Sequence, residues 1–399
     1  MASELRIHPI YREVFNEPHP ADLERLRSSK EELLFSQTTD FVDNRNWEST
    51  ARRVALIFLK IAFFPWGLYS AVRWGLQRLL MIPIYPAQSG LVKILIPQLG
   101  ILGLDYERRK GVEALSQRGH IVRHVRFEKD GKALSGVLIT HPDYGCNGKW
   151  AIQACGNLQP YEIGMEKMAA FYHRKEFSLL LLNNPGVGRS EGESTPQTIG
   201  ETQEMGIRFL ESALKAKKVV MAGFSLGGGA IGQAILRHAF QPDIKYLAIR
   251  QMSFGRVSSV CEKRYREFFN AQWLERLIAP LVRWVGCEMD SVEASRYLQK
   301  NHIPEVIIQR GDSEEAFDCD GAIPKEATLG HTLHEEGITH HKLFIRLPKA
   351  DHIDIDFIGL ATERALEEIV GGEKTPFRLR KVYDSVTRPL ISLWNKVLQ

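Results

Sequence analysis

Six short apolar runs restrict the fold of this chain more than any other feature of its sequence. Each run is apolar on both faces, and the segments between the runs are long enough to form helices. Strands of a parallel sheet that helices cover on both faces have this pattern. The sequence therefore predicts an α/β fold with a mostly parallel central sheet and helices on both of its faces. The runs are KWAIQAC (149–155), FSLLLLNNP (177–185), KKVVMAG (217–223), IKYLAIRQM (244–252), PEVIIQRG (304–311) and HKLFIRLP (341–348).

Two further strands are expected before these runs. Residues 120–142, HIVRHVRFEKDGKALSGVLITHP, alternate between apolar and polar side chains on both sides of Asp130-Gly131. An Asp-Gly pair between two alternating stretches is a strong signal for a two-residue hairpin turn. We therefore expect a hairpin that adds antiparallel strands at one edge of the sheet.

The composition is that of a globular protein with a full apolar core. Of the 399 residues, 44% are hydrophobic and 25% are charged. The formal net charge of +4 is too small to indicate binding to nucleic acid. The few cysteines are irregularly spaced, which argues against a disulfide framework or a zinc ribbon and favours a reducing compartment. They are Cys146, Cys155, Cys261, Cys287 and Cys319.

One segment departs from this soluble pattern. Residues 54–72, VALIFLKIAFFPWGLYSAV, are almost wholly apolar and long enough to cross a bilayer. Lys60 and Pro65 lie inside the segment and disfavour a regular membrane-spanning helix. Three interpretations remain open: a helix packed on the protein, a segment at the membrane surface or re-entrant in it, and a span. We expect membrane contact, where it occurs, through residues 54–80.

The chain divides into three predicted parts. Residues 1–117 form a helical N-terminal extension that carries the apolar segment, and residues 118–370 form the α/β domain. Residues 371–399 carry apolar side chains at helical spacing and more basic than acidic residues, which predicts an amphipathic C-terminal tail. The N-terminal residues lack the pattern of a secretory signal peptide, so we expect a cytoplasmic or membrane-associated protein.

Residues 217–232, KKVVMAGFSLGGGAIG, contain the main candidate for a catalytic residue. A strand is expected to end at Gly223, and a helix is expected to begin after Ser225, within the motif G-x-S-x-G. In this strand–turn–helix context the motif indicates a nucleophilic serine on a sharp elbow. Glycines at 223 and 227 suit such an elbow, because a Cβ atom at either position would clash with the neighbouring strand or helix.

A nucleophilic serine needs a general base and donors for an oxyanion. His352 is the candidate base, since it follows the last apolar run and precedes a predicted helix. The backbone N–H of Leu226 is one candidate oxyanion donor. The second is the N–H of Asn157 or Leu158, in the loop that follows the strand ending at Ala154.

The acid that orients the histidine should follow the run PEVIIQRG. Glu314 stands three residues after the terminal glycine, which is the usual spacing. However, Asp320 begins DGAIP (320–324), which has the form of a turn that leads into a helix. We therefore predict Asp320, with the preceding loop as an insertion, and keep Glu314 and Asp318 as alternatives.

These motifs together resemble those of the α/β-hydrolase superfamily. The resemblance covers residues 120–370 and rests on GFSLGG (223–228), DGAIP, ADHID (350–354) and NNPGVGRSEG (183–192). The last of these resembles the turn Arg-Gly-x-Gly-x-Ser-x-Gly after the fourth strand of the family, with Pro185 in place of the arginine. Many related sequences also have histidine where Cys155 stands. The N-terminal extension resembles, in layout, that of the hydrolase-like CHLPS proteins of chlamydiae.

The resemblance implies a serine hydrolase that acts on an ester, thioester or amide of a small-molecule or lipid acyl substrate. It implies a Ser225–His352–Asp320 triad, an acyl-enzyme intermediate and no cofactor. Two alternatives use the same scaffold: an acyltransferase with the same triad, and a non-catalytic protein that binds membranes or partners.

Two other classes of site are less consistent with the sequence. Residues 227–232, GGGAIG, fit the dinucleotide fingerprint G-x-G-x-x-G, but several strands precede them, and Asp243 stands before the next strand instead of at its end. Residues 331–341, HTLHEEGITHH, are rich in histidine but lack H-E-x-x-H, so we expect no metal site.

Overall fold

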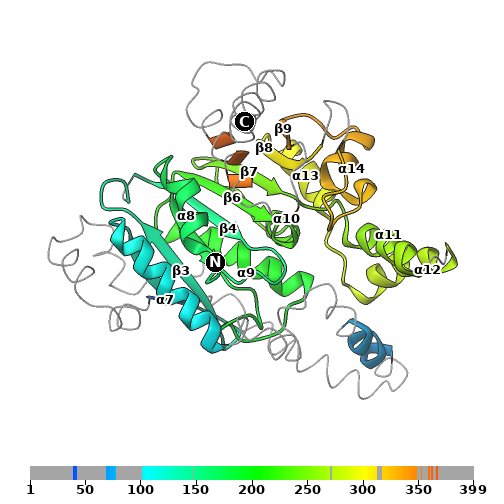
Figure 1. Cartoon of the computed structure of the whole chain (residues 1–399), viewed down its shortest axis with the longest axis horizontal. Helices are drawn as coiled ribbons and strands as arrows, with labels where there is room; N and C mark the ends of the chain where they lie inside the picture. Colours follow the sequence, from blue (N-terminus) through cyan, green and yellow to red (C-terminus); the bar gives the residue numbers. More distant parts are fainter. Residues whose placement is uncertain are drawn as a thin grey trace, which may run out of the picture.

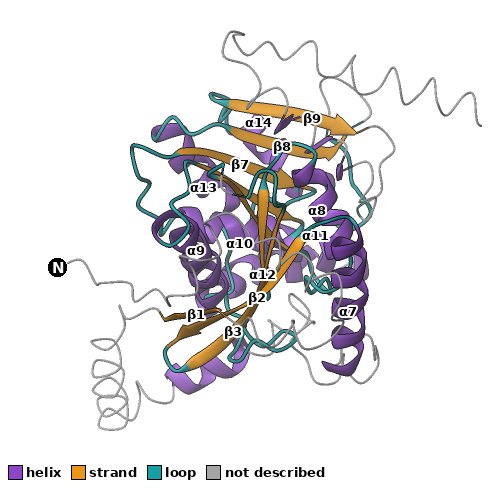
Figure 2. Cartoon of the chain, turned by 90° about the vertical axis from the view of Figure 1, so that its left-hand side faces the viewer, coloured by secondary structure: helices purple, strands orange, loops and turns teal. Residues whose placement is uncertain are grey.

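The central element of the computed structural model is one twisted sheet that runs through the molecule (Figures 1 and 2). The described residues form nine strands in the order β1-β2-β3-β5-β4-β6-β7-β8-β9. The structure describes residues 39–42, 69–77, 101–145, 147–269, 272–311, 317–347, 352, 358–359, 361–362 and 365–366. The strands are β1 (Thr39–Val42), β2 (Ile121–Lys129), β3 (Lys132–Thr140), β4 (Lys149–Ala154), β5 (Ser178–Leu182), β6 (Lys218–Phe224), β7 (Lys245–Gln251), β8 (Glu305–Arg310) and β9 (Lys342–Leu347).

All six apolar runs form strands, and these strands pair in parallel. The predicted hairpin joins β2 and β3 through Asp130 and Gly131, whose φ angles of 51° and 72° are those of a type I′ turn. One expectation needs correction, because β3 is the only strand of the described sheet that runs opposite to the others. β1 pairs in parallel with the outer side of β2, so β1, and not the hairpin, forms this edge of the sheet.

Helices cover both faces of the sheet, as predicted (Figure 2). One apolar core joins α7 and α8 to the sheet and includes Ala361 and Leu366 after β9. The other core, on the opposite face, contains residues of α9, α10 and α13. The helices are α7 (Ile101–Gln117), α8 (Met165–His173), α9 (Pro196–Ser212), α10 (Leu226–Ile235), α11 (Val257–Phe269), α12 (Gln272–Val285), α13 (Ser291–Lys300) and α14 (Leu329–Glu335), with a 3-10 turn η4 (Lys325–Ala327).

The segment before residue 118, predicted to be helical, also contributes a strand. β1 adds to the sheet beside β2, and α7 packs against α8 and β2. Residues 54–68 of the apolar segment and the predicted tail, 371–399, lie outside the described residues, whereas residues 69–77 form a helix. Among the described helices, none combines the length and the apolarity that a membrane span requires.

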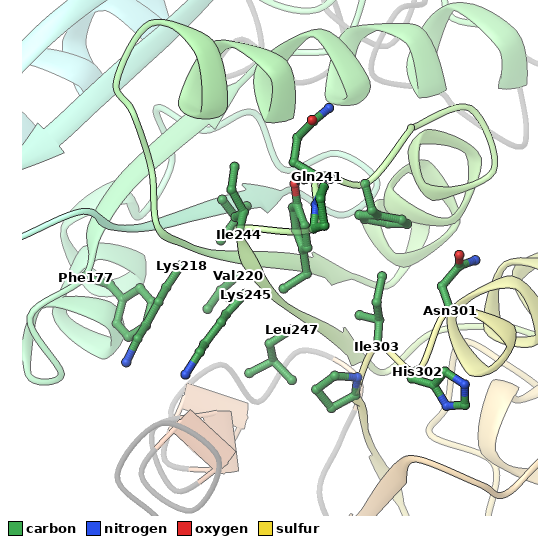
Figure 3. A pocket seen from close by; sticks show the side chains of 15 residues that line it. Phe177, Lys218, Val220, Gln241, Ile244, Lys245, Leu247, Asn301, His302 and Ile303 are labelled. Carbon is green, nitrogen blue, oxygen red and sulfur yellow. Dashed lines mark hydrogen bonds between the residues drawn. The ribbon is translucent and has the colours of Figure 1, made fainter. Parts of the chain in front are cut away.

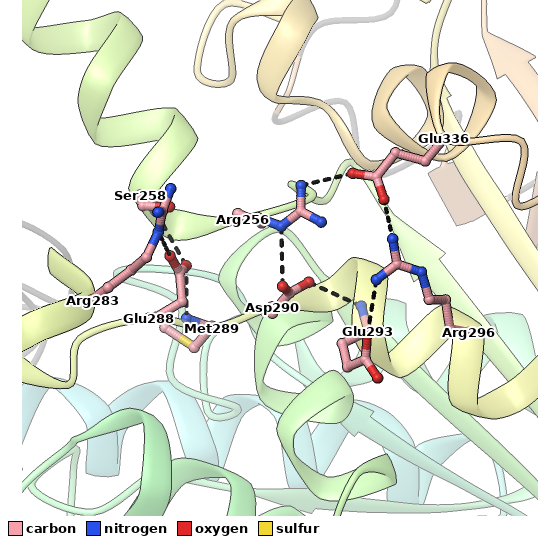
Figure 4. Close-up of polar contacts among 9 residues, drawn as sticks. All are labelled: Arg256, Ser258, Arg283, Glu288, Met289, Asp290, Glu293, Arg296 and Glu336. Carbon is pink, nitrogen blue, oxygen red and sulfur yellow. Dashed lines mark hydrogen bonds and ion pairs between the residues drawn. The ribbon is translucent and has the colours of Figure 1, made fainter. Parts of the chain in front are cut away.

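A network of ion pairs fastens the start of α11 to α13 and α14 (Figure 4). The Arg256 guanidinium contacts Asp290 at 3.0 Å and Glu336 at 2.8 Å, and Arg296 contacts both Glu336 and Glu293. Single exposed pairs contribute little, but shared partners hold several side chains in one geometry. The network therefore attaches the insertion between β7 and β8, which contains α11 and α12, to the body of the domain.

The strand order identifies the fold. Without β1, the order β2-β3-β5-β4-β6-β7-β8-β9, with β3 alone antiparallel, is that of the α/β-hydrolase fold. In this fold the functional residues lie on loops beyond the carboxyl ends of the parallel strands.

Candidate active site

Ser225 lies on a sharp turn between β6 and α10. Its φ of 53° and ψ of −118° belong to a sparsely populated backbone region that costs about 1–3 kcal/mol in a residue with a side chain. The turn is held on both sides: the Ser225 N–H donates to Gln251 O at 2.7 Å, and the Ser253 hydroxyl donates to Ser225 O at 3.1 Å. This conformation exposes the hydroxyl at the end of a strand, as the nucleophile elbow requires.

The two glycines of the motif allow the elbow to close. A Cβ atom on Gly223 would lie 2.3 Å from Gly227 O, and one on Gly227 would lie 2.1 Å from Ala154 O. Both obstacles are backbone atoms, which cannot rotate away as a side chain can. Residues 227–232, considered above as a dinucleotide turn, lie inside α10. There Gly228 and Gly229 permit close packing against Ser253 and Phe254.

His352 bridges the serine to an acid. Its Nε2 lies 2.7 Å from Ser225 Oγ, and its Nδ1 lies 2.7 Å from Asp320 Oδ2. A carboxylate only accepts hydrogen bonds, so Nδ1 donates to Asp320 and Nε2 accepts from the Ser225 hydroxyl. The backbone N–H of His352 also donates to Asp320 O at 3.0 Å, which fixes the two loops to each other.

Asp320 is held by its own turn. Its side chain is buried, and its Oδ1 accepts from the N–H groups of Ala322 (3.0 Å) and Ile323 (2.8 Å). This leaves Oδ2 directed at His352. Of the candidate acids, Glu314 lies outside the described residues, while Asp318 uses its backbone N–H to reach Arg310 O. Asp320 is the candidate that the structure brings to the histidine.

The candidate oxyanion donors lie where the elbow meets the loop after β4. Leu226 is the first residue of α10, so its N–H has no acceptor within the helix. A Cβ on Gly156 would lie 2.7 Å from the Phe224 ring, so this loop packs directly on the residue before Ser225. The N–H of Leu158 donates to Asn157 Oδ1 at 3.0 Å, which makes Leu158 the weaker of the two alternatives.

Cys155 lies beside this loop but is not suited to nucleophilic chemistry. The side chain is buried, and this burial raises the pKa of the thiol to about 12. A thiol with that pKa is protonated at neutral pH, and only the thiolate is a good nucleophile. Cys155 is therefore a small residue of the core.

A chain of buried amides beneath the elbow was not predicted. The Tyr172 hydroxyl donates to Gln153 Oε1 (2.5 Å), Gln153 Nε2 donates to Gln251 Oε1 (3.2 Å), and Gln251 Nε2 donates to Thr362 (2.7 Å). The chain ties the ends of β4 and β7 to the helix after His352. The sequence shows only that a glutamine stands near the end of each of two mainly apolar runs, at Gln153 and at Gln251.

Two pockets in the described part of the chain lie at different ends of the sheet. A cavity of about 30 Å³ lies beside the elbow and is lined by Gln153, Gln159, Met168, Phe171, Tyr172, Phe224, Gln251 and Ile358. A much larger hollow of about 790 Å³ lies at the amino ends of β6 and β7, where Lys218 and Lys245 project from neighbouring strands (Figure 3). Because Ser225 follows the carboxyl end of β6, the larger hollow is at the wrong end of the sheet to hold a substrate of this site.

Three solved structures are similar to about two thirds of this chain. An esterase of Pyrococcus furiosus, Pf2001, is 15% identical with a TM-score of 0.46, covering 65% of this chain and 92% of its own. Est1E of Butyrivibrio proteoclasticus, solved with ferulic acid, is 15% identical with a TM-score of 0.46, covering 62% and 99%. An alpha-beta hydrolase of Vibrio vulnificus is 13% identical with a TM-score of 0.49, covering 70% and 94%.

Sequence comparison is more specific. No curated protein gives a significant match to this chain. A family model described as Chlamydia CHLPS protein (DUF818) matches residues 48–367, which include Ser225, Asp320 and His352 as well as most of the segment before the sheet. The chain therefore belongs to the Chlamydia CHLPS protein (DUF818) family.

Proposed function

We propose that this protein is a serine hydrolase that cleaves a carboxylic ester or thioester. The observation that carries the proposal is the pair of 2.7 Å contacts that joins Ser225 to His352 and His352 to Asp320. Strain at Ser225 and the buried, doubly bonded Asp320 support it, because a structural serine needs neither.

The proposed reaction begins with attack of Ser225 Oγ on the acyl carbonyl carbon. His352 Nε2 removes the hydroxyl proton, while Asp320 accepts the hydrogen bond from Nδ1 and stabilises the imidazolium. The carbonyl oxygen becomes an oxyanion, and the N–H groups of Leu226 and Asn157 stabilise its charge. The imidazolium then donates its proton to the leaving alcohol or thiol, and the acyl group stays on Ser225.

Release of the acyl group repeats these steps with water. His352 Nε2 takes a proton from the water molecule, whose oxygen attacks the acyl carbon and forms a second oxyanion. The collapse of this intermediate returns the proton to Ser225 Oγ and releases a carboxylic acid. The same residues would transfer the acyl group to an alcohol, so product analysis distinguishes a hydrolase from an acyltransferase.

Labelling with a fluorophosphonate probe tests the nucleophile. The wild-type protein should be labelled and should hydrolyse p-nitrophenyl butyrate, whereas Ser225→Ala should lose both activities. Ser212→Ala is the matched control, since Ser212 lies at the end of α9 and its hydroxyl donates to Arg208 O. Labelling that persists in Ser225→Ala would exclude this serine as the nucleophile.

Two carboxylates of one loop test the acid. Asp320→Asn should lower kcat by about 10⁴, because the amide favours the wrong histidine tautomer. Asp318→Asn removes a charge two residues away and should leave kcat close to that of the wild type. Equal losses in the two variants would mean that the charge of the loop, and not the contact of Asp320 with His352, matters. Glu314→Gln extends the test to the third candidate acid.

A further inference from the structure

Exposed large apolar side chains gather at one place on the molecule. Such side chains are found at seven positions in the described part of the chain, and only Tyr106 and Leu158 lie elsewhere. The other five, on the 69–77 helix and on α12, are called here the apolar patch. They are Tyr69 (40% exposed), Val72 (48%), Trp74 (53%), Leu277 (58%) and Trp284 (39%). Clusters of this kind on a soluble domain mark an interaction surface.

The two helices that carry the patch lie against each other although they are about two hundred positions apart in sequence. The Trp284 Nε1–H donates to the Tyr69 hydroxyl at 2.9 Å, and the two rings meet edge to face with centroids 5.6 Å apart. At the other end of the short helix, Gln77 Nε2 donates to Gly286 O at 3.1 Å. These contacts hold the 69–77 helix against the end of α12.

α12 has one wide apolar face, and the core of the domain covers only part of it. Ile278, Val282 and Val285 are buried in the core of the domain, which accounts for the inner side of the helix. Leu277 and Trp284, two helical turns apart, lie at one margin of this face and are exposed. A helix that packs only on its own domain needs an apolar face no wider than that contact, so the exposed margin indicates a second partner.

The patch is bordered by positive charge. Arg73, Arg276 and Arg283 are exposed, and each directly precedes a patch residue: Trp74, Leu277 and Trp284. Glu288 lies 3.7 Å from Arg283 and offsets one of the three charges. Tryptophan and tyrosine favour the headgroup layer of a bilayer, and arginine is attracted to anionic lipid.

We propose that the apolar patch docks on a bilayer surface that contains anionic lipid, with the 69–77 helix and α12 lying in the headgroup layer. The charges favour this partner over a second copy of the chain. A two-fold dimer through the patch would place the arginines of both copies in one interface, and like charges repel. An anionic surface instead complements them.

Vesicle flotation tests the proposal with the full-length protein. Wild-type protein should float with vesicles of phosphatidylcholine and phosphatidylglycerol, and should bind less in high salt or with phosphatidylcholine alone. Leu277→Glu and Arg276→Glu should each weaken binding by about tenfold or more, since each places a negative charge in the interface. Both side chains are exposed, so the variants should fold and retain esterase activity on a soluble substrate.

Matched controls separate the patch from other effects. Tyr106→Glu changes the most exposed apolar side chain outside the patch, and Arg118→Glu reverses an exposed charge elsewhere; both should bind like the wild type. Ser225→Ala should also bind normally, so the failure of the proposed catalysis is distinguishable from the failure of docking. Wild-type binding by Leu277→Glu, or no preference for anionic vesicles, would overturn the proposal. The proposal would also be overturned if the protein did not bind vesicles and instead formed a dimer that Leu277→Glu dissociates.

Discussion

Substituting Gly227 with alanine tests the close contact on which the candidate site is built. The new Cβ atom would lie 2.1 Å from Ala154 O and 2.7 Å from Cys155 O, whereas real Cβ atoms do not approach closer than 3.0 Å. The start of α10 and the end of β4 must therefore separate by about 0.9 Å. The obstacles are backbone atoms, so no side-chain rotation relieves the clash.

The separation acts directly on the proposed oxyanion donors. Leu226 immediately precedes the substituted residue, and Asn157 belongs to the loop that would be pushed away. A displacement of about 1 Å in such a group lowers the rate by about 10², so kcat/KM of Gly227→Ala should fall by that factor. Overpacking should cost about 1–3 kcal/mol of unfolding free energy, offset by about 1 kcal/mol because alanine favours helix.

Steady-state hydrolysis of p-nitrophenyl butyrate and urea unfolding measure the two effects. Gly75→Ala is the control, because Gly75 lies in the 69–77 helix with open space at its Cβ position. That variant should keep wild-type kcat/KM and should be slightly more stable. A Gly227→Ala protein with the kcat/KM of the wild type would refute the argument that the tight elbow sets the geometry of the site.

Two further predictions depend on how far particular side chains are buried. Burial lowers the pKa values of His120 and His124 to about 4 and that of His173 to about 3. As the pH falls below about 6.5, these histidines are therefore protonated in the unfolded chain but stay neutral in the folded chain. The unfolding free energy should therefore fall between pH 6.5 and pH 4, by at most about 1.4 kcal/mol per pH unit for each histidine. Urea unfolding that shows no such fall would contradict the burial of these three side chains. Cys319 is exposed and should be alkylated by iodoacetamide within the folded protein, whereas Cys155 should react only after unfolding. Mass mapping of the modified peptides checks this order, and early modification of Cys155 would contradict it.

Features that depend on neighbouring residues could be predicted from the sequence. The elbow is a continuous stretch of sequence: a strand ends at Phe224, Ser225 is strained, and a helix begins at Leu226. The glycines of this stretch stand where a side chain would clash. The turn at Asp320 is equally local, because its carboxylate accepts N–H groups two and three residues ahead. Such a turn favours aspartate for its own geometry, which made the acid recognisable despite the insertion before it.

Features that depend on distant partners could not be predicted. Gln153 and Gln251 stand 98 positions apart, and nothing in either run indicates that they face each other beneath the elbow. The exposed margin of α12 could not be predicted for a related reason. A wide apolar face is typical of a helix that packs in a core, and only the exposed fractions of Leu277 and Trp284 show that one margin of this face remains outside the core.

The helix between the patch and the acid connects the two proposals. α11 packs along α12, and Arg264 of α11 donates to Gly321 O at 2.5 Å and to Ala322 O at 3.2 Å. These carbonyl groups directly follow Asp320, whose carboxylate orients His352. Docking of α12 on a bilayer would therefore restrict the motion of α11, whose Arg264 binds the turn that follows Asp320. Because exposed helix pairs move more easily than packed cores, this contact gives a physical reason for a membrane surface to influence the chemistry of the site.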